Sequence, residues 1–236
     1  MRKVAVVAGV GPGLGAALVR KLAREGCQVG MFARSADYLQ QLASENQDLT
    51  LLGLATDISD PKQVALGFAQ VRERFGPIDI LVNHASTSSW GGIADLTPEQ
   101  FERAWRVTVF GAFLCCREAA RDMIKSQAGA ILFTGATSSI RGRKGALDFT
   151  SAKFGLRGLA DALARELWPQ NIHVAHVVID GIINPAGKRK AGEVEPDEPL
   201  LDPDDIAATY LALLEQPRSA WTFELEVRPN REEFFV

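Results

Sequence analysis

The chain has 236 residues, of which 47% are hydrophobic and 23% are charged. These values are average for a globular protein and exclude the intrinsically disordered, collagen-like and coiled-coil classes. The 26 Lys and Arg residues are balanced by 29 Asp and Glu residues, giving a net charge of −3, so no overall positive field favours nucleic acid as a partner. The length allows one sizeable core, and no linker divides the sequence, so we predict a single domain over residues 1–236.

Short apolar runs rich in β-branched residues alternate with segments of helical period. The strands are predicted at Val4–Val7, Gln28–Ala33, Leu51–Thr56, Ile78–Val82, Ala130–Thr134, His173–Ile179 and Phe223–Val227. The helices are predicted at Gly13–Glu25, Ala36–Glu45, Pro61–Phe75, Pro98–Ile124, Ala146–Trp168 and Pro203–Glu215, three of them with a capping residue before proline (Asp60, Thr97, Asp202). The strands are apolar without alternation, which is typical of strands covered on both faces. The pattern predicts an α/β, Rossmann-like doubly wound fold with a seven-stranded parallel sheet, helices on both faces and a ligand site at the carboxyl ends of the strands.

The cellular setting follows from the cysteines and from the lack of long apolar runs. Cys27, Cys115 and Cys116 cannot form a framework of bridges and are predicted to be buried small side chains in a reducing compartment. The run Val4–Val7 is too short for a signal peptide, and no window reaches the roughly 18 apolar residues that span a bilayer. We therefore expect a cytoplasmic protein with no membrane partner, and we predict no metal site.

Two loops carry clustered charges. Gly181–Leu201 is a long irregular stretch that contains Lys188-Arg189-Lys190, and a loop of this length in a compact domain predicts a flexible lid. Arg141-Gly142-Arg143-Lys144 lies between the fifth strand and the long helix that follows it. Together the two loops could form a positive patch for an anionic substrate, or they could simply be solvated, and the second interpretation is favoured.

A glycine-rich loop joins the first strand to the first helix. Its residues Gly9, Pro12, Gly13, Leu14 and Gly15 would let backbone amides and the helix N-terminus approach a dinucleotide pyrophosphate. The second strand ends at Arg34, where an enzyme that prefers NAD carries an acidic residue for the ribose 2′-hydroxyl. This favours NADP as cofactor, with NAD possible.

These motifs resemble the short-chain dehydrogenase/reductase family over nearly the whole chain. The resemblance rests on Gly9-x-x-x-Gly13-x-Gly15, on Asp57 after the third strand, on Asn83-His84-Ala85 after the fourth, and on Lys153. It implies that Asp57 and Ile58 contact the adenine, that Asn83, His84 and Ala85 line the cofactor groove, and that Lys153 binds the nicotinamide ribose and acts in catalysis. It also implies a homodimer or homotetramer paired through the two long helices, although core packing within one subunit would explain most of the same apolar residues.

The catalytic positions depart from the family pattern. The family's tyrosine acid/base lies four residues before the lysine, and Phe149 stands there. The family's serine aligns with Ala136 and its asparagine with Thr108. After the sixth strand, Asp180 replaces a proline and Pro185 replaces a threonine that contacts the nicotinamide.

Other polar residues near the strand ends are candidates for the missing acid, namely His84, Ser138, Asp148, Thr150 and Asp180. The pKa of histidine suits proton transfer best, but the resemblance places His84 toward the cofactor. For each candidate a structural hydrogen bond is the favoured interpretation. We therefore expect an NADP(H)-binding oxidoreductase that moves a hydride to or from a carbonyl or enoyl small molecule with an incomplete catalytic set. The alternative is a non-catalytic NADP(H)-binding sensor or partner subunit.

Overall fold

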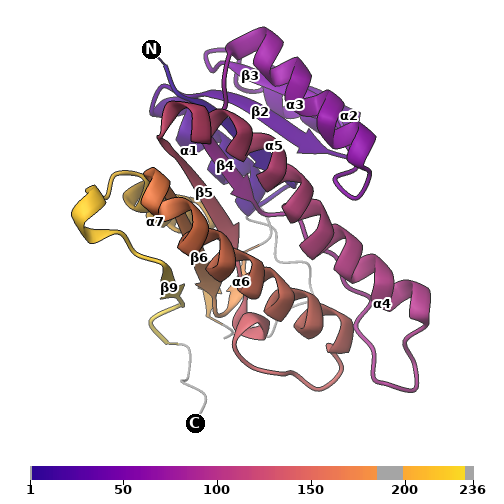
Figure 1. The fold of residues 1–236 in the computed structure, drawn as a ribbon. Helices are drawn as coiled ribbons and strands as arrows, with labels where there is room; N and C mark the ends of the chain where they lie inside the picture. Colours follow the sequence, from indigo (N-terminus) through magenta and orange to yellow (C-terminus); the bar gives the residue numbers. More distant parts are fainter. Residues whose placement is uncertain (1, 185–198, 232–236) are drawn as a thin grey trace.

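The computed structural model describes residues 2–184 and 199–231 of the chain (Figure 1). Within this part, seven parallel strands form one sheet in the order β3-β2-β1-β4-β5-β6-β9. They are β1 (Val4–Ala8), β2 (Gln28–Ala33), β3 (Leu51–Ala55), β4 (Ile80–Asn83), β5 (Gly129–Thr134), β6 (Ile172–Ile179) and β9 (Glu224–Val227). The predicted doubly wound parallel sheet is confirmed, and its strand order reverses direction between β1 and β4.

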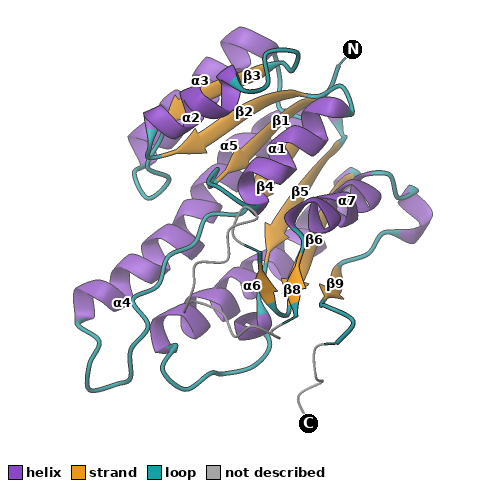
Figure 2. Cartoon of the chain, turned by 180° about the vertical axis from the view of Figure 1, so that it is seen from behind, coloured by secondary structure: helices purple, strands orange, loops and turns teal. Residues whose placement is uncertain are grey.

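Helices cover both faces of the sheet. They are α1 (Leu14–Arg24), α2 (Ala36–Ser44), α3 (Pro61–Phe75), α4 (Pro98–Trp105), α5 (Gly111–Ser126), α6 (Leu147–Leu167) and α7 (Pro203–Leu214). Apolar side chains of α1, α2 and α7 form one buried cluster with the strands, and those of α3, α5 and α6 form a second cluster on the opposite face. Figure 1 shows α5 and α6 in front of the sheet, and Figure 2, seen from behind, shows α1 and α7 in front. No helix among the described residues has the length and apolarity needed to cross a bilayer.

The three predicted helix caps form as expected. The Asp60 side chain accepts hydrogen bonds from the amides of Lys62 and Gln63. Thr97 accepts from the amide of Gln100 in a capping box, and Asp202 accepts from the amide of Asp204. In each helix the proline occupies the first turn, where its missing amide hydrogen costs no intrahelical bond. Local sequence therefore sets these three helix starts.

The helix predicted at Pro98–Ile124 is continuous but not uniform. A π-helical segment, Arg106–Phe110, separates α4 from α5. The wider turn of a π-helix accommodates one extra residue without ending the helix, so the apolar period alone does not reveal it. The resulting long helix lies along α6 and extends past the end of the sheet (Figure 1).

The stretch predicted as an irregular lid begins and ends in regular structure. Ile182–Ile183 (β7) pairs in parallel with Leu200–Leu201 (β8) to form a separate two-stranded sheet. The expectation of an entirely irregular stretch is therefore wrong at its two ends, where backbone pairing across the stretch overrides the sequence pattern. Lys188-Arg189-Lys190 and Pro185 lie outside the described residues.

Candidate active site

The glycine loop lies where the strand order reverses, between the carboxyl ends of β1 and β4. The amides of His84 and Ala85 both donate to the carbonyl of Ala8, at 2.9 Å and 2.8 Å. A Cβ on Gly9 would lie 2.4 Å from the Ala85 nitrogen, and Gly9 has φ of 104°. Glycine is therefore required at position 9 for contact between two loops of the protein, in a conformation that other residues rarely adopt. This crevice is the usual ligand position in doubly wound sheets.

The N-terminus of α1 opens onto this crevice. Gly13 is the N-cap, with φ of 102°, and it supplies no capping side chain. Amides in the first turn of a helix have no intrahelical acceptor, so those of Leu14 and Gly15 are available to an anion. A Cβ on Gly11 or Gly13 would meet no atom within 4 Å. Open space and unsatisfied amides are what a phosphate group requires.

The residues after β2 and β3 lie at the same carboxyl edge of the sheet. Arg34 is exposed directly after β2. The Asp57 carboxylate accepts hydrogen bonds from the amide and hydroxyl of Ser59, at 2.9 Å and 2.7 Å. Ile58 is buried at 6% exposure and packs under Gly111. Arg34 and Asp57 thus lie at the carboxyl edge of the same sheet, after β2 and β3, whereas the Ile58 side chain belongs to the core.

Asn83 is the last residue of β4 and His84 follows it, and the two side chains face different neighbours. Asn83 Nδ2 donates to Cys116 Sγ at 3.3 Å, and its Oδ1 is buried without a partner among the described residues. His84 Nδ1 lies 3.2 Å from the hydroxyl of Thr134, which also bonds the buried Tyr210 hydroxyl at 2.7 Å. Burial, and secondarily the charge of Lys153, lowers the pKa of His84 from 6.5 to about 4. His84 is therefore neutral at physiological pH.

A pocket of about 780 Å³ lies beside His84, and we call it the Lys153 pocket. Loops at the carboxyl ends of β4, β5 and β6, together with α6, form its walls. Its lining residues are His84, Ser86, Trp90, Thr134, Gly135, Ala136, Thr137, Ser138, Arg141, Gly142, Arg143, Phe149, Lys153, Ile179, Asp180, Gly181, Ile182 and Ile183. A Cβ on Gly15 would lie 3.4 Å from the His84 ring, so this histidine joins the glycine loop to the pocket.

Lys153 is 2% exposed, and its Nζ donates to the Thr134 carbonyl at 2.8 Å. Burial lowers its pKa from 10.5 to about 8. The ammonium also lies 5.5 Å from the centre of the Phe149 ring. As the four-residue spacing predicts, Phe149 and Lys153 face the same pocket. Phe149 offers that pocket a benzene ring and no ionisable proton.

The structure separates the other candidate acids into two groups. Ser138 and Asp180 line the pocket with His84, whereas Asp148 and Thr150 are not among its lining residues. Asp148 is fully buried, and its Oδ2 accepts a hydrogen bond from the Ser89 amide at 2.6 Å. Thr108 is likewise buried, inside the π-helical segment.

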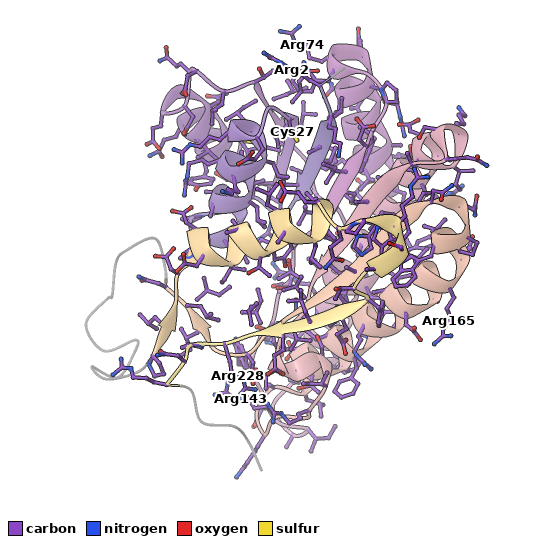
Figure 3. The ribbon with its side chains drawn as sticks, turned by 90° about the vertical axis from the view of Figure 1, so that its left-hand side faces the viewer. Arg2, Cys27, Arg74, Arg143, Arg165 and Arg228 are labelled. Atoms are coloured by element: carbon purple, nitrogen blue, oxygen red, sulfur yellow. The ribbon has the colours of Figure 1, made fainter. Side chains whose placement is uncertain are left out.

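Asp180 is the centre of a buried ion-pair cluster. Its carboxylate accepts a short hydrogen bond from the Thr137 hydroxyl and pairs with Arg141 at 3.1 Å. It also pairs closely with Arg228, which follows β9. Figure 3 shows Arg143 and Arg228 at the same end of the molecule, away from Arg2 and Arg74. These bonds hold the loops after β5, β6 and β9 together.

Sequence reasoning missed two residues of this region, Trp90 and Arg228. The Trp90 ring lies 5.2 Å from Phe149, and the Arg143 guanidinium lies 5.8 Å from Trp90. Trp90 belongs to the loop after β4, and its place after a strand in a doubly wound fold was the available signal. Arg228 reaches Asp180 across 48 residues, and no local pattern indicates that contact.

Gly135, which lines the Lys153 pocket, also has a packing role. A Cβ there would lie 2.4 Å from His176 Nε2. His176 is fully buried, and its Nδ1 bonds Glu224, which also pairs with Arg157. The absence of a side chain at position 135 lets β5 and the buried imidazole approach each other.

Comparisons with known proteins agree with the fold. A family model described as short chain dehydrogenase matches residues 3–195. A 3alpha-hydroxysteroid dehydrogenase from Mediterraneibacter gnavus is 32% identical over 236 residues, which cover 94% of each chain. The structure of an alcohol dehydrogenase from the archaeon Thermococcus sibiricus, complexed with 5-hydroxy-NADP, matches with a TM-score of 0.89 at 25% identity over 100% of both chains. That of a metagenomic short-chain oxidoreductase in complex with NADP has a TM-score of 0.84 at 27% identity over 98% of both chains. The chain belongs to the short-chain dehydrogenase family.

Proposed function

We propose that the protein is an NADP(H)-dependent oxidoreductase that moves a hydride to or from a carbonyl or enoyl carbon of a small molecule without a tyrosine acid/base. The observation that carries the proposal is the position of His84, which lies beside Gly15 at the uncapped start of α1 and lines the Lys153 pocket. One ligand can thus span the amide cradle and the pocket. The NADP-bound structures that the chain resembles support the choice of cofactor.

The residues at the site fit a dinucleotide. The amides of Leu14 and Gly15 would hold its phosphates, and the exposed Arg34 would meet the 2′-phosphate of NADP. Lys153 has one donor committed to the Thr134 carbonyl, which leaves donors for the nicotinamide ribose. The bound nicotinamide supplies the hydride, and the chain contributes orientation and positive charge.

Proton transfer is the step for which the chain is poorly equipped. Phe149 cannot donate a proton, Ala136 cannot polarise a carbonyl, and His84 is neutral. The proton would therefore have to come through Lys153 and a bound water. Loss of a general acid typically lowers a rate by about 10²–10⁴-fold. The same observation favours a second candidate function, an NADP(H)-binding sensor or partner subunit without turnover.

Calorimetric titration with NADPH and NADH tests the binding proposal. We expect NADPH to bind more tightly and Arg34→Asp to abolish this preference, because a carboxylate repels the 2′-phosphate and accepts the 2′-hydroxyl of NAD. Arg74→Asp makes the same charge change in the last turn of α3, at the opposite end of the molecule from Arg143 (Figure 3), and should leave the preference intact. Absence of heat with either coenzyme would refute the proposal.

Steady NADPH oxidation across ketones, quinones and enoyl thioesters separates the enzyme from the non-catalytic binder. The double variant Phe149→Tyr with Ala136→Ser should gain carbonyl reductase activity if the pocket still orients the nicotinamide. If NADPH binds but neither the wild-type protein nor the double variant oxidises it with any of these compounds, the non-catalytic function is the correct one.

We also propose that the protein assembles as a homodimer or homotetramer in the cytoplasm. Phe101, Trp105, Phe113 and Phe154 on α4, α5 and α6 are each 38–44% exposed, and exposed aromatic side chains on neighbouring helices favour an interaction surface. The three cysteines are free and buried, in keeping with a reducing compartment. Light scattering on the purified protein gives the mass that decides the assembly.

A further inference from the structure

The inner wall of the Lys153 pocket is a row of two rings and two cations. Arg143 lies 5.8 Å from the Trp90 ring centre, Trp90 lies 5.2 Å from Phe149, and Phe149 lies 5.5 Å from the Lys153 ammonium. Each ring therefore has a cation near its face. All four residues line the pocket, so a ligand there meets aromatic surface bordered by positive charge.

Trp90 is held in place at a conformational cost. It has φ of 52°, a left-handed value that strains a non-glycine residue, and the residue remains 54% exposed. The preceding residue, Ser89, donates its amide to the buried carboxylate of Asp148, one position before Phe149 on α6. Asp148 thus ties the Trp90 loop to the helix that carries Phe149. A strained, anchored and half-exposed indole at a pocket indicates a ligand-binding surface.

The pocket favours negative charge in a ligand. Its described lining includes the cations Arg141, Arg143 and Lys153, and Asp180 is the acidic residue among them. The Asp180 carboxylate is engaged by Thr137, Arg141 and Arg228. Arg143 and Lys153 lie next to the rings of Trp90 and Phe149, so they can stabilise an anion formed there.

The missing tyrosine restricts which acceptors react well. Hydride addition to an isolated ketone gives an alkoxide, which is strongly basic and requires a proton donor at the site. Hydride addition to a quinone gives a hydroquinone monoanion, a delocalised phenolate whose conjugate acid has a pKa near that of tyrosine, about 10. Water can protonate such a product after the hydride has moved.

We propose that the substrates of this site are planar, electron-poor conjugated carbonyl compounds, with quinones as the class, packed against Trp90 and Phe149. The bonding electron pair of the C4–H bond of NADPH moves with its hydrogen to the quinone, giving NADP⁺ and the hydroquinone monoanion. Lys153 and Arg143 stabilise that anion, and a proton from water completes the hydroquinone. This inference rests on the proposed NADP(H)-dependent function.

The first test compares two bicyclic compounds of similar size, 1,4-naphthoquinone and 1-tetralone, as oxidants of NADPH. We expect the wild-type protein to prefer the quinone by at least about 100-fold in kcat/KM, the lower bound of the effect of a missing acid. Phe149→Tyr should raise kcat/KM for 1-tetralone at least tenfold and change the quinone value less. Equal kcat/KM values, or no quinone reduction while calorimetry shows NADPH bound, would overturn the inference and leave the cofactor proposal standing.

The second test needs no turnover. In the cofactor-free protein 1,4-naphthoquinone should quench tryptophan fluorescence with a saturating dependence, and Trp90→Phe should remove most of that quenching. Trp105→Phe is the control, because Trp105 lies on α4, outside the pocket lining and on the surface proposed for subunit contact. Quenching that survives in Trp90→Phe would refute the aromatic wall as the quinone site.

Discussion

Replacing Lys153 by methionine should stabilise the cofactor-free protein near neutral pH. Burial of the ammonium lowers its pKa from 10.5 to about 8, which corresponds to a cost of about 3 kcal/mol for holding the charge inside the protein. Methionine removes that cost but leaves the Thr134 carbonyl without its donor at 2.8 Å, a loss of about 1 kcal/mol. The expected net gain in the free energy of unfolding is therefore about 1–2 kcal/mol.

The gain should disappear as pH rises. Below pH 8 both the folded and the unfolded wild-type chains carry the Lys153 proton, so the full cost is present. Between the folded pKa of about 8 and the unfolded value of 10.5 only the unfolded chain keeps the proton, and wild-type stability rises with pH relative to the variant. From about pH 7.5 to about pH 9.5 the difference should shift by about 2 kcal/mol in favour of the wild type.

Urea unfolding of both proteins at several pH values measures this difference, and other titrating groups cancel because both proteins contain them. Lys125→Met, at an exposed position on α5, controls for the added methionine and should show a difference that is constant with pH. A Lys153→Met difference that is equally constant would show that the lysine is not buried as a cation, and the reasoning would fail.

Three further substitutions test contacts around the site, each by urea unfolding. Gly9→Ala should lower the free energy of unfolding by at least about 2 kcal/mol, because the new Cβ would clash with backbone and the position has a positive φ. Gly11→Ala is the control and should change stability by less than about 0.5 kcal/mol, because its Cβ would meet no atom within 4 Å. Equal costs would contradict the loop geometry. Gly135→Ala should lower the free energy of unfolding by about 1–3 kcal/mol because its Cβ would clash with His176. In a chain that already carries His176→Ala, the same substitution should cost at least about 1 kcal/mol less. Equal costs in the two backgrounds would exclude the clash. Asp180→Asn should cost about 1.5–3 kcal/mol because it removes the buried carboxylate that pairs with Arg141 and Arg228, while Arg228 keeps its pair with Glu226. A cost below about 1 kcal/mol would mean that the Asp180 pairs add little stability.

The glycine loop shows how far a sequence can predict a site. Its position after an apolar strand and before an apolar helix follows from hydrophobic period alone, and the structure leaves the N-terminus of α1 without a side-chain cap. The sequence does not reveal that the glycines act differently. Gly9 is required by the approach of Ala85, while Gly11 and Gly13 leave open space. That difference depends on where β4 lies beside β1.

The sequence by itself determined the order of strands and helices, the capped helix starts and the shared face of Phe149 and Lys153. These features depend on residues within a few positions of one another, where period, capping and helical spacing act directly. Tertiary structure decided the contact of Trp90 with Phe149, the pairing of Arg228 with Asp180 and the burial that lowers the pKa of Lys153. These contacts join residues tens of positions apart, and they exist only after the parallel sheet has brought its strand ends to one edge.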